Sequence, residues 1–300
     1  MTHPPPALAI LDSDGGLSSS GPDGPVVWWS VTKPVLAGAA LILVAQGRLA
    51  LDAPLAEEAF TLRQLLAHRA GLGDYGPLPA YEEAVARGDP PWSLAEMRAR
   101  VEAQNPPRAP GAPFAYSNLG YALIGQLVAD ATGLPLGAAL DALVLAPLGI
   151  TDARLAQTPA DLAATAFPPP PGYHPGHVHH GVLVGPAASA ARALRGIAEG
   201  ALLPPELAAA QRARDPVAAG PLPGRPWAEP GYGLGLMAGT MADPGAGARL
   251  SVLGHSADGP GSVGAVYHAP ATGRTAAVFA PGSDDGAVER AVLSALLGVP

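Results

Sequence analysis

The sequence predicts an α+β fold in which an antiparallel sheet, flanked by helices, is assembled from both ends of the chain. Three observations predict it: a short apolar strand near the start, a long middle segment with helical periodicity, and several short strands followed by a closing helix. The chain has 300 residues, of which 48% are apolar, so it can bury one large core or two cores that share a cleft.

The first elements surround Ser30. Residues 7–12 are typical of a short buried strand, and residues 25–29 of a second strand or an extended lead-in. A helix is expected over residues 31–46. Proline is tolerated only in the first turn of a helix, so Pro34 requires this helix to begin close to Ser30.

The middle of the chain is predicted to be mostly helical. Thr61-Leu-Arg-Gln64 is a capping box that opens a helix. Proline, glycine and acidic residues dominate from Gly71 to Pro91 and indicate no regular element there. Apolar residues at helical spacing predict further helices over residues 93–101, 119–132 and 136–145.

The last third returns to a strand pattern. After helices at 189–200 and 205–214, short β-like runs are expected at 250–253, 261–268 and 275–280, with hairpin connections at 243–245 and 271–274. A helix over residues 285–297 closes the chain. We therefore predict a sheet part of residues 1–50 and 185–300, a mostly helical part of residues 51–184, and an active site in the cleft between them.

Composition excludes several classes of protein. The net charge is −8 and the basic residues are scattered, which argues against a nucleic-acid partner. The absence of cysteine excludes disulfides and thiolate catalysis. The apolar stretch 34–45 is shorter than the ~20 residues that cross a bilayer, so no membrane partner is expected. No signal-peptide pattern is seen, and we expect a cytoplasmic protein.

A single lysine, Lys33, stands among sixteen arginines. Lysine can lose its proton when it is buried, whereas arginine in practice cannot, so a lone lysine in an arginine-rich chain suggests a chemical role. The alternative is chance retention of one surface lysine. Lys33 lies three residues after Ser30 at a predicted helix start, where the hydroxyl and the amine can touch. A lysine in a low-dielectric site can activate a serine nucleophile.

Two further segments carry suitable groups. Tyr116-Ser-Asn118 places a phenol and an amide on one loop, although an ordinary asparagine cap would look the same. Gly254-His255-Ser-Ala-Asp258 follows a predicted strand, whose edge could donate a backbone N–H to an oxyanion. His255 could add a positive charge or a hydrogen bond, or be incidental to a turn.

These segments, in this order, resemble the β-lactamase-related serine hydrolases. The family includes class C β-lactamases, D-alanyl-D-alanine carboxypeptidases, D-aminopeptidases and esterases. The resemblance extends over nearly the whole chain and rests on the following segments: Trp28-Trp-Ser-Val-Thr-Lys33, Gln46-Gly-Arg-Leu-Ala-Leu-Asp52, Thr61 to Leu72, Pro110 to Tyr121, Pro147-Leu-Gly149, Tyr232-Gly-Leu-Gly235 and Gly254-His255-Ser.

The resemblance implies a β-lactamase/transpeptidase-like fold and a role for each matching residue. Ser30 attacks a carbonyl and is acylated, Lys33 and Tyr116 move its proton, and Asn118 orients the substrate. His255 stands where other members carry lysine or histidine, and the backbone N–H groups of Ser30 and Asp258 form the oxyanion hole. The family needs no cofactor, and none is expected here.

The chain departs from the family pattern in two places. Ala257 replaces the glycine of the third motif, so its methyl group lies where a peptide or β-lactam would approach the strand. The N-terminus is too short for the usual first helix, and a partner subunit in a homo-oligomer could supply the missing cover. We therefore favour an esterase or peptidase acting on a small ester, amide or peptide. The alternatives are a β-lactamase or penicillin-binding D-Ala-D-Ala carboxypeptidase, and a non-catalytic binding relative.

Four histidines at positions 174, 177, 179 and 180 have spacing that could suit zinc, which would make the protein a metal-dependent hydrolase. No neighbouring carboxylate completes such a set, so a loop that borders the cleft and contributes one histidine to substrate contact is favoured. His68 and the pair Trp28-Trp29 are interpreted as packing residues.

Overall fold

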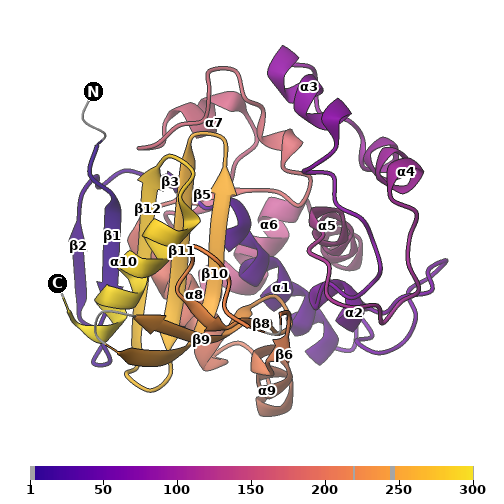
Figure 1. Cartoon of the computed structure of the whole chain (residues 1–300). Helices are drawn as coiled ribbons and strands as arrows, with labels where there is room; N and C mark the ends of the chain where they lie inside the picture. Colours follow the sequence, from indigo (N-terminus) through magenta and orange to yellow (C-terminus); the bar gives the residue numbers. More distant parts are fainter. Residues whose placement is uncertain (1–3, 219, 244–246, 300) are drawn as a thin grey trace.

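The computed structural model describes residues 4–218, 220–243 and 247–299. Most strands join one antiparallel sheet. Its strands are β1 (Ala7–Leu11), β2 (Leu17–Ser20), β6 (Asp215–Pro216), β7 (Trp227–Glu229), β8 (Gly231–Tyr232), β9 (Met237–Asp243), β10 (Ala248–Gly259), β11 (Ser262–Ala269) and β12 (Arg274–Pro281). Their order is β2-β1-β12-β11-β10-β9-β8-β6, with β7 pairing β9. Strand β1 thus completes a sheet whose other long strands come from the last quarter of the chain (Figure 1).

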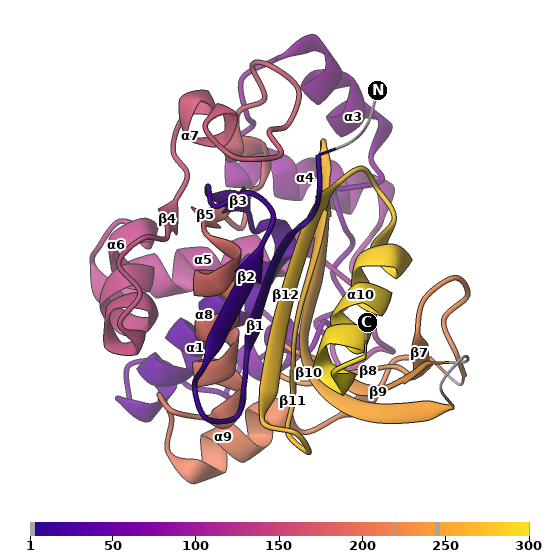
Figure 2. The same ribbon diagram turned by 90° about the vertical axis from the view of Figure 1, so that its left-hand side faces the viewer.

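Helices cover both faces of this sheet. Helix α10 (Asp285–Leu297) packs on one face of β11 and β12, while α8 (Ala187–Glu199) packs on the other face (Figure 2). Behind α8 lies α1 (Thr32–Ala45), which is apolar on nearly all sides and almost wholly buried, as expected of a helix enclosed on every face. The main core therefore lies between the sheet, α8 and α1.

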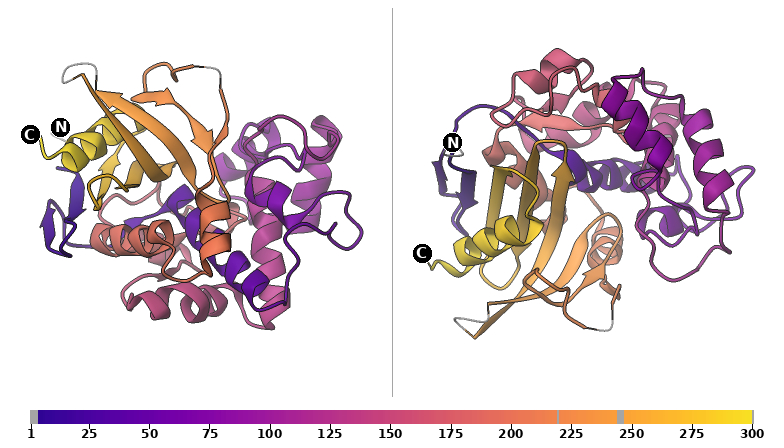
Figure 3. Two further views of the ribbon diagram at one scale, coloured as in Figure 1. Left: turned by 90° about the horizontal axis from the view of Figure 1, so that it is seen from below. Right: turned by 45° about the horizontal axis from the view of Figure 1, so that its top comes forward.

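The segment between α1 and α8 forms the helical part, which stands beside the sheet (Figure 3). Its helices are α2 (Leu62–Leu66), α3 (Pro79–Arg87), α4 (Leu94–Gln104), α5 (Asn118–Thr132), α6 (Leu136–Leu140) and α7 (Pro159–Ala163), with single turns at 141–145, 146–148 and 175–177. Strands β3 (Val26–Val27), β4 (Arg154–Leu155) and β5 (Leu183–Gly185) form a small second sheet. Helix α9 (Pro205–Arg212) follows α8.

Most predicted elements are present, but several elements of the structure were not predicted, including α7 and the strand β9. The capping box at Thr61 and Gln64 forms with both reciprocal hydrogen bonds. Helix α3 was not predicted, because the prolines and glycines around it conceal a short helix that starts at Pro79 and ends at Gly88 in left-handed backbone. Strand β2 was also missed, since its four residues are all exposed and carry no apolar alternation. Residues 244 and 245 of the predicted connection at 243–245 lie outside the described residues.

No single helix in the described part of the chain combines the length and apolar character needed to cross a membrane. The bent pair of segments 118–132 and 136–148, which meet at 80°, satisfies both criteria only when the two are taken together.

Candidate active site

Ser30 lies in a single 3₁₀ turn, Trp29–Val31, that leads directly into α1. The preceding residue, Trp29, has a φ of 39°, a left-handed conformation that is strained for a bulky side chain. Its indole is held in place, because Nε1 donates to Ser262 Oγ at 2.9 Å and the ring packs directly over Gly259. The sheet therefore fixes the backbone on the N-terminal side of Ser30.

Lys33 is completely buried one turn later. Its Nζ lies 3.0 Å from Ser30 Oγ, 2.7 Å from Asn118 Oδ1 and 3.3 Å from His180 Nε2. Burial lowers the pKa of Lys33 from 10.5 to about 7, an effect that the nearby negative charge of Asp74 partly opposes. A substantial fraction of the amine is therefore unprotonated at neutral pH, as a general base requires.

Tyr116 lies on the other side of the same serine. Its hydroxyl donates to Ser30 Oγ at 3.0 Å. Its ring packs against His68, with 4.4 Å between centroids, and Lys33 Nζ lies 4.9 Å from the Tyr116 ring centroid. Burial raises the pKa of the Tyr116 phenol above its ordinary value, so this group keeps its proton at neutral pH. His68 is a packing residue, as predicted, and it supports the tyrosine.

Asn118 is not the cap of its helix. Ser117 caps α5 by accepting from Gly120 N, which leaves the Asn118 side chain available to Lys33. The Asp74 carboxylate accepts hydrogen bonds from the Asn118 backbone N at 2.8 Å and from Nδ2 at 3.1 Å. The second bond orients the amide so that Oδ1 faces Lys33. Sequence analysis missed Asp74, which lies in the acidic loop where no motif marked it.

Strand β10 supplies the third wall of the site. Its pairing with β9 ends at Gly254, so residues 255–259 pair with β11 alone and leave one edge facing the turn that carries Ser30. His255 Nε2 lies 3.0 Å from Tyr232 Oη, and burial lowers the pKa of His255 to about 3. From the sequence, His255 is expected to contribute either a hydrogen bond or a positive charge. The structure is compatible with the hydrogen bond but not with a positive charge at neutral pH.

Ser30 lines two hollows. The larger is a cavity of about 460 Å³ with Tyr116 and His255 on its walls and Asp258 at β10. Its remaining lining includes apolar side chains and one ion-paired arginine: Phe114, Val217, Leu222, Met237 and Arg225. The smaller cavity, about 160 Å³, is bordered by His180 and by several aromatic residues: Trp29, Tyr75, Tyr81 and Tyr173. A molecule bound at Ser30 could thus extend in two directions.

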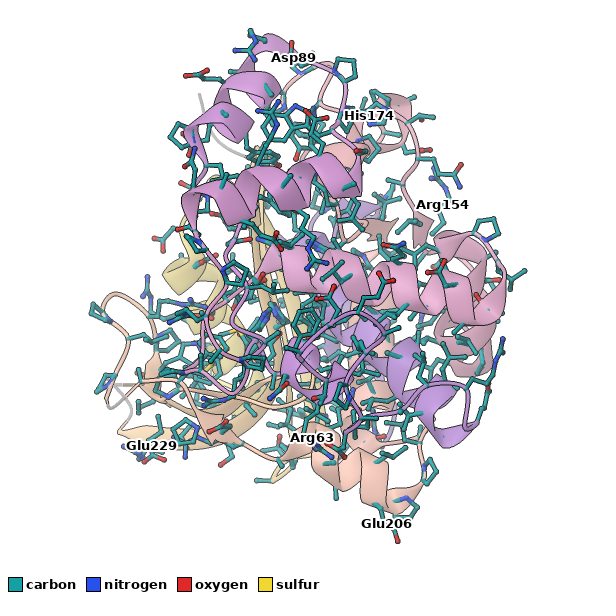
Figure 4. All side chains as sticks on the ribbon, turned by 90° about the vertical axis from the view of Figure 1, so that its right-hand side faces the viewer. Arg63, Asp89, Arg154, His174, Glu206 and Glu229 are labelled. Atoms are coloured by element: carbon teal, nitrogen blue, oxygen red, sulfur yellow. The ribbon has the colours of Figure 1, made fainter. Side chains whose placement is uncertain are left out.

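The four-histidine loop does not gather into one cluster. His174 Nδ1 accepts a hydrogen bond from Gly176 N, and Figure 4 shows this histidine at the upper end of the molecule, in the region of Asp89. His177 and His179 pack edge-on against tyrosines. Within the described ranges, no three histidine, aspartate or glutamate side chains are close enough to share a metal ion. Only His180 reaches the site, which is the cleft-border role favoured for this loop.

The structure brings together Ser30, Lys33, Tyr116 and Asn118 in direct contact, with His255 and Asp258 on the adjoining wall. It identifies His180 as the histidine of the 174–180 loop that reaches the site, and it adds two residues that sequence analysis did not place there: Asp74 and Tyr232. For Tyr232, the sequence did contain one indication, because the segment Tyr232-Gly-Leu-Gly235 is among those that resemble the family.

An antiparallel sheet with helices on both faces, a helical insertion, and a serine at the start of the central helix define the β-lactamase/transpeptidase-like fold. Solved structures agree. A D-stereospecific amidohydrolase from Streptomyces sp. superposes with a TM-score of 0.81 at 22% identity, covering 99% of this chain and 95% of that one. An octameric penicillin-binding protein homologue from Pyrococcus abyssi gives 0.76 at 21% identity, covering 99% and 74%.

Sequence comparison identifies the family. Residues 12–298 match the family model described as Beta-lactamase. Esterase EstB of Burkholderia gladioli is 32% identical, over 72% of this chain and 67% of that protein. The chain therefore belongs to the beta-lactamase family of serine hydrolases, as the sequence motifs predicted.

Proposed function

We propose that the protein hydrolyses a small ester or amide through an acyl-enzyme intermediate on Ser30. The observation that carries this proposal is the position of Ser30 Oγ, which lies 3.0 Å from both Lys33 Nζ and the Tyr116 hydroxyl and lines a cavity. A base and an acid thus contact one nucleophile. A binding relative without catalysis would need neither.

In acylation, Lys33 takes the Ser30 proton while Oγ forms a bond to the substrate carbonyl carbon. The resulting tetrahedral oxyanion is stabilised by backbone N–H groups. Among the described residues, the Ser30 N–H has no hydrogen-bond acceptor, which suits this role. We assign the second N–H to Asp258, on the segment of β10 that β9 leaves unpaired.

When the tetrahedral intermediate collapses, the bond to the leaving group breaks. Tyr116 donates a proton to the departing alcohol or amine and recovers one from the Lys33 ammonium. Deacylation runs the same transfers with water: Tyr116 and Lys33 remove its proton, and Ser30 regains a proton as the acid leaves. Asn118 keeps Lys33 in place throughout.

Several features favour an uncharged ester or amide over a β-lactam or a C-terminal peptide. Both of those carry a carboxylate, which calls for a cation beside the nucleophile. His255 is neutral here, and Arg225, although it lines the cavity, is already paired with the buried carboxylate of Glu289. Ala257 adds a methyl group to the β10 wall. EstB is an esterase, and the Streptomyces relative is a D-stereospecific amidohydrolase.

We also propose that the site joins two parts of the chain. Ser30 and Lys33 belong to the part formed by residues 1–50 and 185–300, whereas Tyr116 and Asn118 belong to residues 51–184. On this view neither part alone holds a complete set of reacting groups.

The test is covalent labelling read by intact mass. The wild-type protein and Ser30→Ala are treated with a fluorophosphonate and, separately, with penicillin. We expect a phosphonyl adduct that depends on Ser30 and little penicilloyl adduct. No Ser30-dependent adduct from either reagent would contradict the proposal, and a stable or rapidly turned-over penicilloyl adduct would favour the β-lactam alternative. Loss of ester hydrolysis after EDTA treatment would support a metal-dependent reaction instead.

A further inference from the structure

His180 is the one member of the Lys33 environment whose chemistry the proposed mechanism leaves unused. Its ring is fully buried and its Nε2 lies 3.3 Å from Lys33 Nζ. The segment that carries it is fixed close to Ser30: the Leu183 N–H donates to Thr32 Oγ1 at 3.0 Å, and the Leu183 carbonyl accepts from Trp28 N at 2.9 Å. The segment that follows His180 is therefore held to residues on both sides of the nucleophile, Trp28 and Thr32.

The valence of a neutral amine makes this contact informative. An unprotonated lysine has two N–H bonds and one lone pair, arranged tetrahedrally. Three polar atoms surround Nζ: Asn118 Oδ1, His180 Nε2 and Ser30 Oγ. Asn118 Oδ1 can only accept, so it takes one N–H. If His180 Nε2 accepts the other, the lone pair is left directed at the serine hydroxyl.

We propose that His180 is a positioning residue that accepts a hydrogen bond from neutral Lys33 through Nε2 and thereby directs the amine lone pair to Ser30 Oγ. The inference rests on the proposed function, since it specifies how the base of that reaction is oriented. It also requires the His180 ring proton to lie on Nδ1. The opposite tautomer would donate into the lone pair and leave Ser30 without a base.

The surroundings keep His180 neutral. Burial lowers its pKa well below 6.5, and the charge of Lys33 lowers it further. The titratable groups that face Lys33 from the neighbouring elements are Asp74, Tyr116, Tyr121, His68, His180 and His255. Asp74 is the one acid among them, and it is hydrogen-bonded to Asn118 rather than to His180.

The test compares three substitutions. His180→Phe keeps the size of the ring and removes the acceptor, His180→Gln supplies a carbonyl acceptor of similar reach, and His179→Phe is the matched control in the neighbouring histidine. The readout is the second-order rate of Ser30 phosphonylation as a function of pH, with folding checked by thermal melting. His179 packs on Tyr75, and Lys33 contacts Ser30, Asn118 and His180 among the described residues rather than His179, so His179→Phe should keep the wild-type profile.

For His180→Phe we expect the plateau rate to fall about 10- to 100-fold, because an acceptor for a reacting amine is lost. The acid limb, which is the part of the pH profile where the rate rises with pH, should move to lower pH. The reason is that the Lys33 ammonium also loses an acceptor, which lowers the pKa of Lys33. His180→Gln should restore most of the rate and the position of the limb. In wild-type protein, ¹⁵N NMR should show the proton of the His180 ring on Nδ1.

Several results would overturn the inference. One is a wild-type profile for His180→Phe. Another is an equal loss in His180→Phe and His180→Gln with an unmoved acid limb, which indicates a packing role. If His180→Phe does not fold, two other results still contradict the inference. One is a wild-type His180 ring that is protonated on Nε2. The other is a large rate loss in His180→Gln with an acid limb at the wild-type position. An unreactive Ser30 in the wild-type protein would instead contradict the proposed function.

Discussion

Two fully buried charged side chains, Lys33 and Glu289, have opposite surroundings. Lys33 contacts three neutral polar side chains, and its nearest acid, Asp74, acts from a distance. Glu289, on α10, accepts hydrogen bonds from Nε and Nη2 of Arg225, and further hydrogen bonds from Trp227 Nε1 and Ser256 Oγ. One group is buried without a paired opposite charge, and the other is fully paired.

The contrast shows that burial alone does not identify a functional charge. A buried ion that is paired and hydrogen-bonded on every side keeps its charge and ties elements together. A buried ion among neutral partners is instead poised to change its protonation state, which is the property a base needs. Glu289 joins α10 to β10 behind the cavity, whereas Lys33 lies beside Ser30. Four experiments test this distinction.

Lys33→Met should have the largest effect. Removal of the base is expected to lower ester turnover by about 10³-fold. The stability of the fold should be unchanged or increased, because methionine avoids the cost of burying an amine. Turnover of a p-nitrophenyl ester and chemical denaturation measure the two quantities. Turnover within tenfold of wild type would show that Lys33 is a structural residue like Glu289.

Glu289→Gln should show the reverse pattern. Loss of the carboxylate charge leaves Arg225 without its partner and should lower the free energy of unfolding by about 3 kcal/mol. Molecules that remain folded should keep their turnover. Glu199→Gln, which breaks an exposed ion pair with Arg195 on α8, is the control and should cost about 0.4 kcal/mol. Equal losses in the two variants would remove the distinction between the buried pair and a surface pair.

The pH dependence should follow Lys33. Because the amine must be neutral to act as a base, kcat/KM should rise with pH through about 7. The folded-state pKa lies below the unfolded value of 10.5, so between these values the unfolded chain binds more protons. The Lys33 contribution to stability therefore increases from pH 7 upward. Lys33→Met should lose that slope between pH 7 and 9, and a slope that persists would assign it to another group.

Asp74→Asn should have the smallest effect. It removes the negative charge near Lys33 and so increases the difference between Lys33 and the ion-paired Glu289. Without the carboxylate, which raises the pKa of Lys33, the acid limb of kcat/KM should move to lower pH by a fraction of a unit. Asp130→Asn, at an exposed position on the same helix as Asn118, should leave the profile unmoved. A shift to higher pH would mean that Asp74 does not stabilise the charged amine.

The sequence predicted the groups that lie close together along the chain or in recognisable motifs. The single lysine three residues after Ser30 marked the base, and Tyr116 and Asn118 followed from a tripeptide in family order. These assignments depend on helical spacing and motif order, both of which are properties of sequence. Several strands and helices were predicted for the same reason, because their periodicities are local. Their assembly into a sheet from both chain ends was inferred from the order of the elements.

Asp74 and His180 could not be predicted in the same way. Each lies on a loop whose path depends on packing elsewhere in the fold. Asp74 is held near Lys33 by two hydrogen bonds to Asn118 at the start of α5, and His180 is placed against Lys33 by the pairing of β5 with β3. No spacing encodes these approaches. The histidine loop even carried a second interpretation as a zinc site, since four closely spaced imidazoles look alike in sequence whether they converge or diverge.

The pairing of β1 with β12 has a consequence for how the molecule is made. Residues 7–11 are synthesised long before residues 274–281, so until β12 has been made, β1 can pair only with its other neighbour, β2. Ser30 and Lys33 are likewise made early, but the wall that carries His255 belongs to a late hairpin. Such non-local pairing slows folding. A nascent chain therefore holds its nucleophile long before it has a cavity in which to use it.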